Sequence, residues 1–153
     1  MNQHPIQLRD ITIKTLNLTV NDPNVARDYQ GELVLRIEVG STELSAEDPL
    51  ISVGLRVQTE PKEAATTEFA ANGNPSFSVE VELVGHFVVD YAHFKFEHLT
   101  EWSQVNAPYL LLPYVREQVY GLAIRAGIRG LFFPLFVQPR LIPKSATNAV
   151  KLN

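Results

Sequence analysis

The feature that most constrains this chain is a series of four segments in which apolar and polar residues alternate. The segments are residues 6–20, 33–39, 51–57 and 77–83. Alternation with a period of two predicts strands that have one dry face and one wet face. No helical pattern separates these segments, and parallel neighbours need a crossover of a dozen or more residues. The four segments therefore predict an antiparallel sheet.

The first segment contains an irregularity that predicts a bulged or bent strand. Its apolar residues shift phase twice, first between Leu8 and Ile11 and again between Ile13 and Leu16. In a regular strand, each one-residue shift would move the following apolar residues to the other face of the sheet. Residues 21–24, Asn-Asp-Pro-Asn, then end the strand in a turn.

The helical signal lies in the last third of the chain. Apolar residues spaced by three and four recur over residues 106–126, which predicts a helix whose apolar stripe lies on the sheet. Pro113 falls inside this pattern, so the helix either kinks there or begins near Leu111 after an irregular lead-in. A Thr-Glu pair at residues 100–101 predicts a short preceding helix that carries Trp102.

Together these patterns predict an α+β fold, with a four-stranded antiparallel sheet and one long and one short helix packed on one face. At 153 residues the chain has the size of one domain, so residues 1–153 are expected to form a single unit. Prolines interrupt the apolar residues 131–143, which are therefore expected to be extended on a surface. Residues 144–153 are expected to form a loosely ordered tail.

Composition argues against several classes of function. The chain has no cysteine, which removes disulfides, thiol nucleophiles and thiolate metal sites. The net charge of -4 argues against nucleic acid as a partner, because binding to phosphates needs a basic surface. The chain shows neither a long apolar run nor a signal-peptide pattern, so we expect no membrane insertion and a cytoplasmic location.

No motif for catalysis or for a cofactor is recognisable. His93, Glu97 and His98 form the one local group that resembles a metal site. Three residues separate His93 from Glu97, whereas the inverted zincin pattern needs two. The sequence also lacks a nucleophile elbow, a phosphate-binding loop and a dinucleotide fingerprint. We therefore expect no enzyme, no metal site and no cofactor, and an enzyme whose catalytic pair assembles only on folding stays open as an alternative.

Hydrophobic side chains crowd the last third of the chain beyond what one helix on one sheet face can bury. They are Trp102, Tyr109, Leu110, Leu111, Leu112, Tyr114, Tyr120, Leu131, Phe132, Phe133, Leu135 and Phe136. Each of these taken singly is expected to belong to the core. The surplus of the whole set predicts an interface with other subunits or with ligands.

Two segments resemble the SecB family of export chaperones. Residues 106–117, Asn-Ala-Pro-Tyr-Leu-Leu-Leu-Pro-Tyr-Val-Arg-Glu, are similar to the family pattern of Asn-x-Pro, an apolar run and Pro-Tyr-x-Arg-Glu. Residues 28–35 resemble the segment in which an aromatic residue and Gln-Pro-Glu lead into the second strand. The Leu-Arg-Val of residues 55–57 also fits, so the resemblance spans about residues 6–142.

The resemblance implies a chaperone that holds unfolded polypeptides, including preproteins for export, in a hydrophobic groove. It also implies a homotetramer assembled as a dimer of dimers. Tyr29 falls where the family has a groove aromatic. The expected client-binding residues are Tyr29, Leu16, Leu18, Val20, Trp102, Tyr109, Leu110, Phe132, Phe133 and Phe136.

Delivery of clients to the SecA motor is the part of the resemblance from which this sequence departs most. Family members use acidic residues on the sheet, and Glu80 matches one of them, so SecA is kept as a candidate partner. Thr15 and Thr19 stand at the corresponding positions of the first strand, and the metal-binding tail of the family is missing. The alternative is a SecB-like chaperone dedicated to an antitoxin or another single partner.

Overall fold

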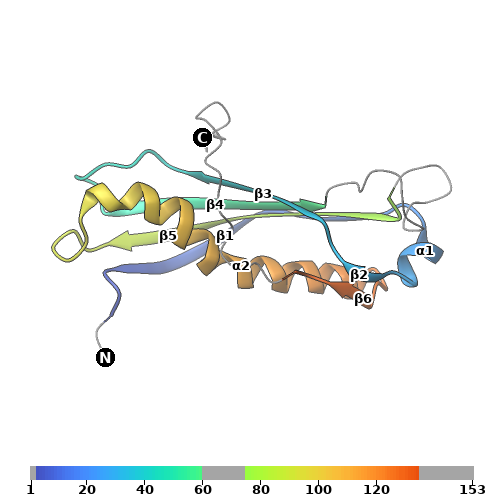
Figure 1. The fold of residues 1–153 in the computed structure, drawn as a ribbon. Helices are drawn as coiled ribbons and strands as arrows, with labels where there is room; N and C mark the ends of the chain where they lie inside the picture. Colours follow the sequence, from blue (N-terminus) through green and yellow to red (C-terminus); the bar gives the residue numbers. More distant parts are fainter. Residues whose placement is uncertain (1–2, 60–74, 135–153) are drawn as a thin grey trace.

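The structure, a computed structural model, describes residues 3–59 and 75–134 of the chain. An elongated sheet carries one long helix on one of its faces (Figure 1). The elements are, in chain order, β1 (Ile6–Val20), α1 (Pro23–Arg27), β2 (Gln30–Glu32), β3 (Leu35–Ser41), β4 (Leu50–Thr59), β5 (Phe77–Val89), the 3₁₀ helix η1 (Phe96–His98), α2 (Leu99–Arg125) and β6 (Gly130–Phe132).

The main sheet has four antiparallel strands in the order β1-β5-β4-β3, which confirms the predicted antiparallel sheet and α+β class. β1 therefore lies beside β5, and β1 and β3 form the two edges of the sheet. β2 and β6 pair in parallel and form a separate two-stranded sheet. These two strands were not predicted from the sequence, because three residues are too few to show an alternating pattern.

The predicted irregularity of β1 is confirmed. Its pairing with β5 shifts register between Leu8 and Asp10 and again between Ile13 and Thr15, which are the two places where the apolar pattern slips. Each shift inserts one extra residue and so cancels the change of face. As a result, the apolar residues before and after each bulge all point to the face that carries α2.

The turn predicted at residues 21–24 is the beginning of the short helix α1. The Asp22 carboxylate accepts hydrogen bonds from the backbone N–H groups of Asn24 and Val25, at 3.1 and 3.2 Å. Pro23 occupies the first helical position, where its missing N–H costs nothing. These residues end β1 as predicted, but they do so by capping a helix.

Helix α2 differs from its prediction because it runs without interruption from Leu99 to Arg125. Pro108 and Pro113 both lie inside it, so the separate short helix around Trp102 and the irregular lead-in were wrong. Each proline removes one backbone hydrogen bond and crowds the preceding turn. Burial outweighs this cost, since nine residues of α2 are buried, most of them hydrophobic.

The core lies between α2 and the helix-bearing face of the central strands β4 and β5. Leu55, Val57, Val81 and Leu83 are fully buried on these strands, and Leu111 of α2 is fully buried above them. Burying one such side chain contributes about 1.5–3 kcal/mol. The central strands therefore hold the helix in place.

Some predictions fall on residues that the structure does not describe. They are the loosely ordered tail at 144–153, most of the extended segment 131–143 and the span of the single domain; all stay predictions. In the described part of that segment, Leu131 and Phe133 are buried and Phe132 is exposed. Over residues 3–59 and 75–134, no helix combines the length and apolar character needed to cross a bilayer.

We expect Leu111→Ala to lower the free energy of unfolding by about 2–5 kcal/mol, because it opens a cavity between the helix and the sheet. The matched control is Ile124→Ala on the same helix, whose side chain is 69% exposed. It should change stability by less than about 0.5 kcal/mol. Urea titrations at one protein concentration, followed by the emission of Trp102, measure both variants, and equal effects would contradict the assigned core.

Candidate functional site

The predicted client-binding residues lie in separate parts of the molecule. Tyr29 packs on Phe77 at the start of β5, and Trp102 packs on Phe87 near its end. Ten residues of strand separate these two contacts, which corresponds to about 33 Å. The set therefore does not form one cluster.

The first part surrounds Tyr29, which follows helix α1. Its ring meets that of Phe77 edge to face, with centroids 5.0 Å apart and planes at 90°. Val20 and Leu18 lie close by, because they pair with Phe77 and Val79 on the helix-bearing face. Both side chains are partly buried and pack against the core. This part combines an aromatic ring with the apolar end of β1.

The small sheet of β2 and β6 continues directly from Tyr29. Gly31 in β2 has a φ of 149°, a conformation that residues with a side chain rarely adopt. The SecB segment that residues 28–35 resemble has proline at this position, and proline cannot adopt that φ.

The two phenylalanines at the end of β6 differ in exposure. Phe132 is 49% exposed, whereas Phe133 is buried and donates its backbone N–H to the Tyr120 hydroxyl at 3.2 Å.

The second part, at the other end of β5, holds Trp102. This side chain is 6% exposed and meets Phe87 edge to face at 5.1 Å. Trp102 and Phe133 therefore belong to the core in this structure, and neither offers a surface to a partner without rearrangement. Phe136 lies outside the described residues.

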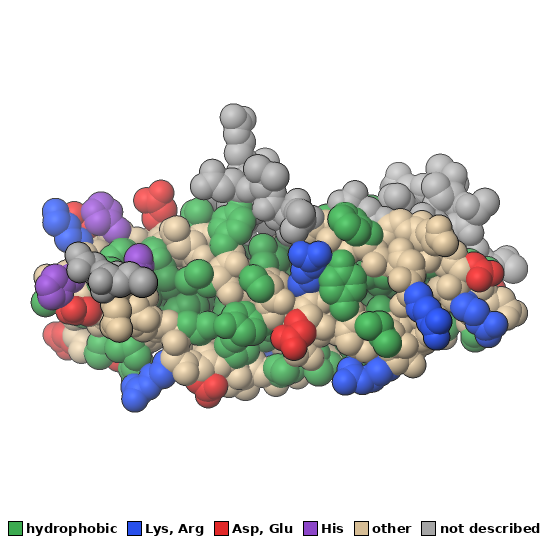
Figure 2. All heavy atoms as spheres, turned by 90° about the horizontal axis from the view of Figure 1, so that it is seen from below, with side chains coloured by type: hydrophobic (Ala, Val, Ile, Leu, Met, Phe, Trp, Pro, Cys, Tyr) green, Lys and Arg blue, Asp and Glu red, His purple; other side chains and the backbone are tan. Residues whose placement is uncertain are grey.

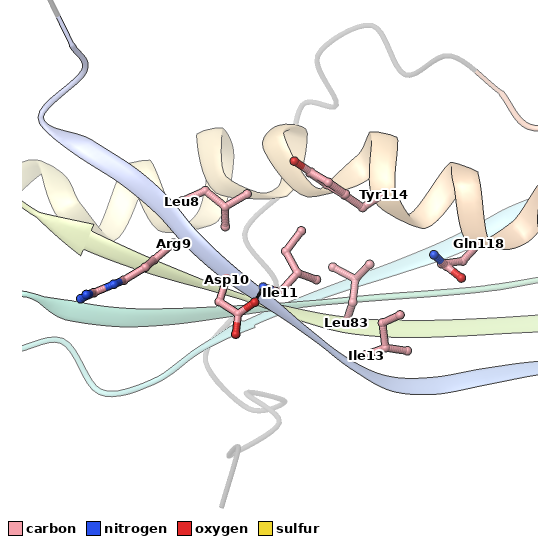
Figure 3. Close-up of a pocket in the computed structure, with 8 residues that line it drawn as sticks. All are labelled: Leu8, Arg9, Asp10, Ile11, Ile13, Leu83, Tyr114 and Gln118. Atoms are coloured by element: carbon pink, nitrogen blue, oxygen red, sulfur yellow. Dashed lines mark hydrogen bonds between the residues drawn. The ribbon is translucent and has the colours of Figure 1, made fainter.

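The third part is a groove between the edge strand β1 and helix α2, called here the β1–α2 groove. It has a volume of about 430 Å³. It is lined by Leu8, Arg9, Asp10, Ile11, Ile13, Leu83, Tyr114 and Gln118. Figure 3 shows that the aliphatic side chains point toward the helix, whereas Arg9 and Asp10 extend away from it. The groove thus has an apolar floor and a polar outer rim.

Exposed hydrophobic side chains lie in this groove and continue from it to Leu16 and Leu110. Ile13, Leu16, Leu110 and Tyr114 are between 42% and 48% exposed. Figure 2 shows hydrophobic side chains gathered in a broad band along the middle of the helix-bearing face. Tyr109, farther around α2, is partly buried, and its buried hydroxyl oxygen has no hydrogen-bond partner among residues 3–59 and 75–134. In the part of the chain that the structure describes, no strand pairs with the outer edge of β1.

The opposite face of the sheet holds Glu80, the residue expected to contact SecA. Arg56 binds it with two nitrogens on one carboxylate oxygen, Nη2 at 2.5 Å and Nε at 2.8 Å. The hydrogen bond to Glu80 raises the pKa of Arg56 above its ordinary value. Thr15 and Thr19 pair with Glu82 and Ser78 on this same face. Glu80, the predicted contact for SecA, is therefore already held by an arginine.

His93 and His98 each pair with a single acidic residue. His93 Nδ1 lies 2.7 Å from Asp90 Oδ2, and this hydrogen bond lowers the pKa of Asp90. His98 Nε2 lies 3.5 Å from a carboxylate oxygen of Glu97. Among the described residues there is no group of three or more side chains suited to holding a metal ion.

Several residues of the site were absent from the predicted client-binding residues, although Tyr114 and Tyr120 belong to the hydrophobic set of the last third of the chain. Ile13 and Tyr114 are exposed hydrophobic residues of the β1–α2 groove. Tyr120 supplies the hydroxyl that accepts the backbone N–H of Phe133, next to β6. The order of strands in the sheet makes β1 an edge, and an alternating pattern carries no information about that order. The spacing of Leu110 and Tyr114 on one side of α2 was the signal that could have found the groove.

Comparisons with known proteins agree on one family. The family model described as preprotein translocase subunit SecB matches residues 1–139. The protein-export protein SecB of Gluconacetobacter diazotrophicus is 31% identical over 128 residues, which cover 77% of this chain and 71% of that protein.

A solved structure has the same fold. It is a SecB-like chaperone of Mycobacterium tuberculosis in complex with a ChAD peptide from the HigA1 antitoxin. The TM-score is 0.62 at 19% identity, and the match covers 88% of this chain and 93% of that one.

We expect Arg56→Ala and Glu80→Ala to couple by about 1 kcal/mol in a double-mutant cycle of unfolding free energy, because the pair is close and only partly exposed. The control pair is Lys95 and Glu97, which lie 3.6 Å apart with both side chains mostly exposed. Their coupling should stay below about 0.3 kcal/mol. A coupling of the first pair no larger than that of the control would show that Arg56 does not hold Glu80.

Proposed function

Since this chain belongs to the SecB family of preprotein translocase subunits, we propose that it is a molecular chaperone that holds unfolded polypeptides. The observation that supports this best is the band of exposed hydrophobic side chains on the helix-bearing face. Monomeric soluble proteins rarely expose a large contiguous apolar surface, and those that do use it for binding. We expect the protein to act in the cytoplasm and on preproteins for export.

Burial of apolar surface suits this function because it is not directional. Removing apolar area from water contributes about 25 cal/mol per Å², so a few hundred Å² offset the cost of ordering a short client segment. Contacts of this kind accept many sequences, since they need no fixed pattern of hydrogen bonds. Neither a nucleotide nor a catalytic residue is needed to capture or release a client.

The proposed client contacts are the predicted residues that have accessible surface in the described structure. They are Tyr29, Leu16, Leu18, Val20, Tyr109, Leu110 and Phe132. Trp102 and Phe133 are buried, so we propose that they support the fold of the binding surface. Phe136 stays a predicted contact.

We further propose that the β1–α2 groove is where copies of this chain associate, in a dimer of dimers. Ile13 and Tyr114 leave apolar surface exposed beside the outer edge of β1. An edge strand with exposed hydrophobic side chains is a surface that tends to pair with another chain. A second copy would cover both the apolar floor and the edge.

A chaperone dedicated to one partner is the second candidate. Two features favour it over delivery to SecA. Glu80 is held by Arg56, and Thr15 and Thr19 provide no negative charge beside it. A SecB-like chaperone of the same fold binds a peptide from an antitoxin. A general holdase would protect several unrelated clients, whereas a dedicated chaperone would protect only its own.

We expect the purified protein, at about one chaperone assembly per client, to suppress light scattering by several unrelated refolding clients, because its apolar surface covers theirs. Tyr29→Ala should require several-fold more protein for the same suppression. Phe96→Ala is the matched control, since this aromatic is 39% exposed but lies at the other end of the molecule. Failure of the unmodified protein to protect any client would contradict the general holdase.

We expect Ile13→Lys and Tyr114→Lys to reduce the mass in solution to that of a smaller assembly, because each places a charge in the apolar groove. Light scattering coupled to size exclusion measures the mass. Leu50→Lys is the control, since Leu50 is 56% exposed but lies on the opposite sheet face. A monomeric unmodified protein, or variants that assemble normally, would refute this interface.

A further inference from the structure

Strand β6 approaches Tyr29 more closely than any side chain at position 130 would allow. A Cβ atom added to Gly130 would overlap the carbonyl oxygen of Tyr29 and lie 2.8 Å from Cγ of Gln30. Gly130 does not have a positive φ, so this restriction comes from the contact and not from its backbone conformation. The backbone of β6 therefore rests directly against the peptide that carries the Tyr29 side chain.

β6 is in turn attached to helix α2. The Tyr120 hydroxyl accepts the backbone N–H of Phe133 at 3.2 Å, and Phe133 is 2% exposed. The Arg116 guanidinium lies over the Tyr120 ring, 5.4 Å from its centroid. Burial raises the pKa of Tyr120, but the Phe133 N–H and Arg116 together outweigh burial, so the net pKa is lowered. The phenol oxygen of Tyr120 thus acts as a hydrogen-bond acceptor for Phe133 and Arg116.

These contacts form a continuous connection from the helix to the aromatic. It runs from Tyr120 through Phe133 and Gly130 to Tyr29, whose ring meets Phe77 of the main sheet. The pairing of β2 with β6 involves three residues on each strand, with one further bond from Leu33 N–H to the Phe132 carbonyl. A pair this short depends on its anchors at both ends.

We infer that β6 is a brace, and that Gly130 and Tyr120 are positioning residues that fix Tyr29 for binding an unfolded polypeptide. This inference rests on the proposed chaperone function. Neither residue needs to touch the client. Gly130 sets how closely β6 approaches the Tyr29 peptide, and Tyr120 holds the far end of β6 on the helix. The strands of the brace are not part of the four-stranded sheet, and the test leaves the buried Leu131 and Phe133 of the brace unchanged.

The test compares Gly130→Ala and Tyr120→Phe with two matched controls. Gly121→Ala makes the same change within α2, where the added Cβ meets only the flexible end of Arg125 at 3.2 Å. Tyr91→Phe removes a hydroxyl that also bonds to backbone, through the Ser45 and Asp48 carbonyls, at the other end of the molecule. The probe is a fluorescently labelled, reduced and carboxamidomethylated lactalbumin, and its binding is followed by anisotropy.

We expect Gly130→Ala and Tyr120→Phe to weaken binding of this probe roughly tenfold, and both controls to bind as the unmodified protein does. Amide exchange at residues 29–32 should become faster, while the emission of Trp102, the single tryptophan, stays unchanged. In a Tyr29→Ala background, Gly130→Ala should have little further effect, because it acts through Tyr29.

The outcomes separate this inference from the proposed function. If the unmodified protein binds neither this probe nor any other unfolded client, the chaperone function fails. If it binds, and Tyr120→Phe and Gly130→Ala bind equally well, the brace is overturned and the chaperone function stands. Full additivity of Gly130→Ala and Tyr29→Ala would also overturn it, since a general loss of stability does not depend on Tyr29. Tyr120→Phe keeps the test valid if Gly130→Ala does not fold.

Discussion

One α-helix covers one face of a four-stranded sheet, and the difference in their widths shapes the whole molecule. With its side chains an α-helix is about 10–12 Å across, whereas the outer strands of such a sheet lie about 14 Å apart and their side chains extend further. α2 therefore buries Val53 and Val81 of the central strands completely, but leaves Ile13 and Leu16 of the edge strand 46% and 43% exposed. Part of the apolar surface proposed for binding is therefore the strip of the sheet that the helix does not reach.

The bulges of β1 decide how large that surface is. Without the register shifts after Leu8 and Ile13, Ile11 and Ile13 would face the polar side of the sheet. With them, a fifteen-residue strand presents one apolar side along its whole length. This feature could be predicted from the sequence, because a slip in a two-residue period is visible wherever it occurs. The edge position of β1 could not, since it depends on pairing between strands far apart in the chain.

The errors of prediction have the same origin. Pro108 and Pro113 suggest a broken helix when each is judged by its local effect, but tertiary burial on the sheet keeps α2 continuous. Tyr29 was predicted as a client contact from the family resemblance and Trp102 from the surplus of hydrophobic residues, although only the folded chain shows them at opposite ends of β5. Glu80 was identified as an acidic surface residue, and its arginine partner comes from another strand. Residue type and period predict elements well, whereas relations between elements need the structure.

The ion pair of Arg56 with Glu80 also affects how this protein meets charged molecules over distance. On the sheet face away from the helix, Arg36 and Arg56 lie close to Glu38, and Arg56 also holds Glu80 and pairs across the strands with Glu82, so most of these neighbouring charges are compensated. A surface of this kind projects little electrostatic field beyond the Debye length of about 8 Å at physiological ionic strength. Encounters at this face therefore gain little from long-range steering, and their rates should depend only weakly on the concentration of salt.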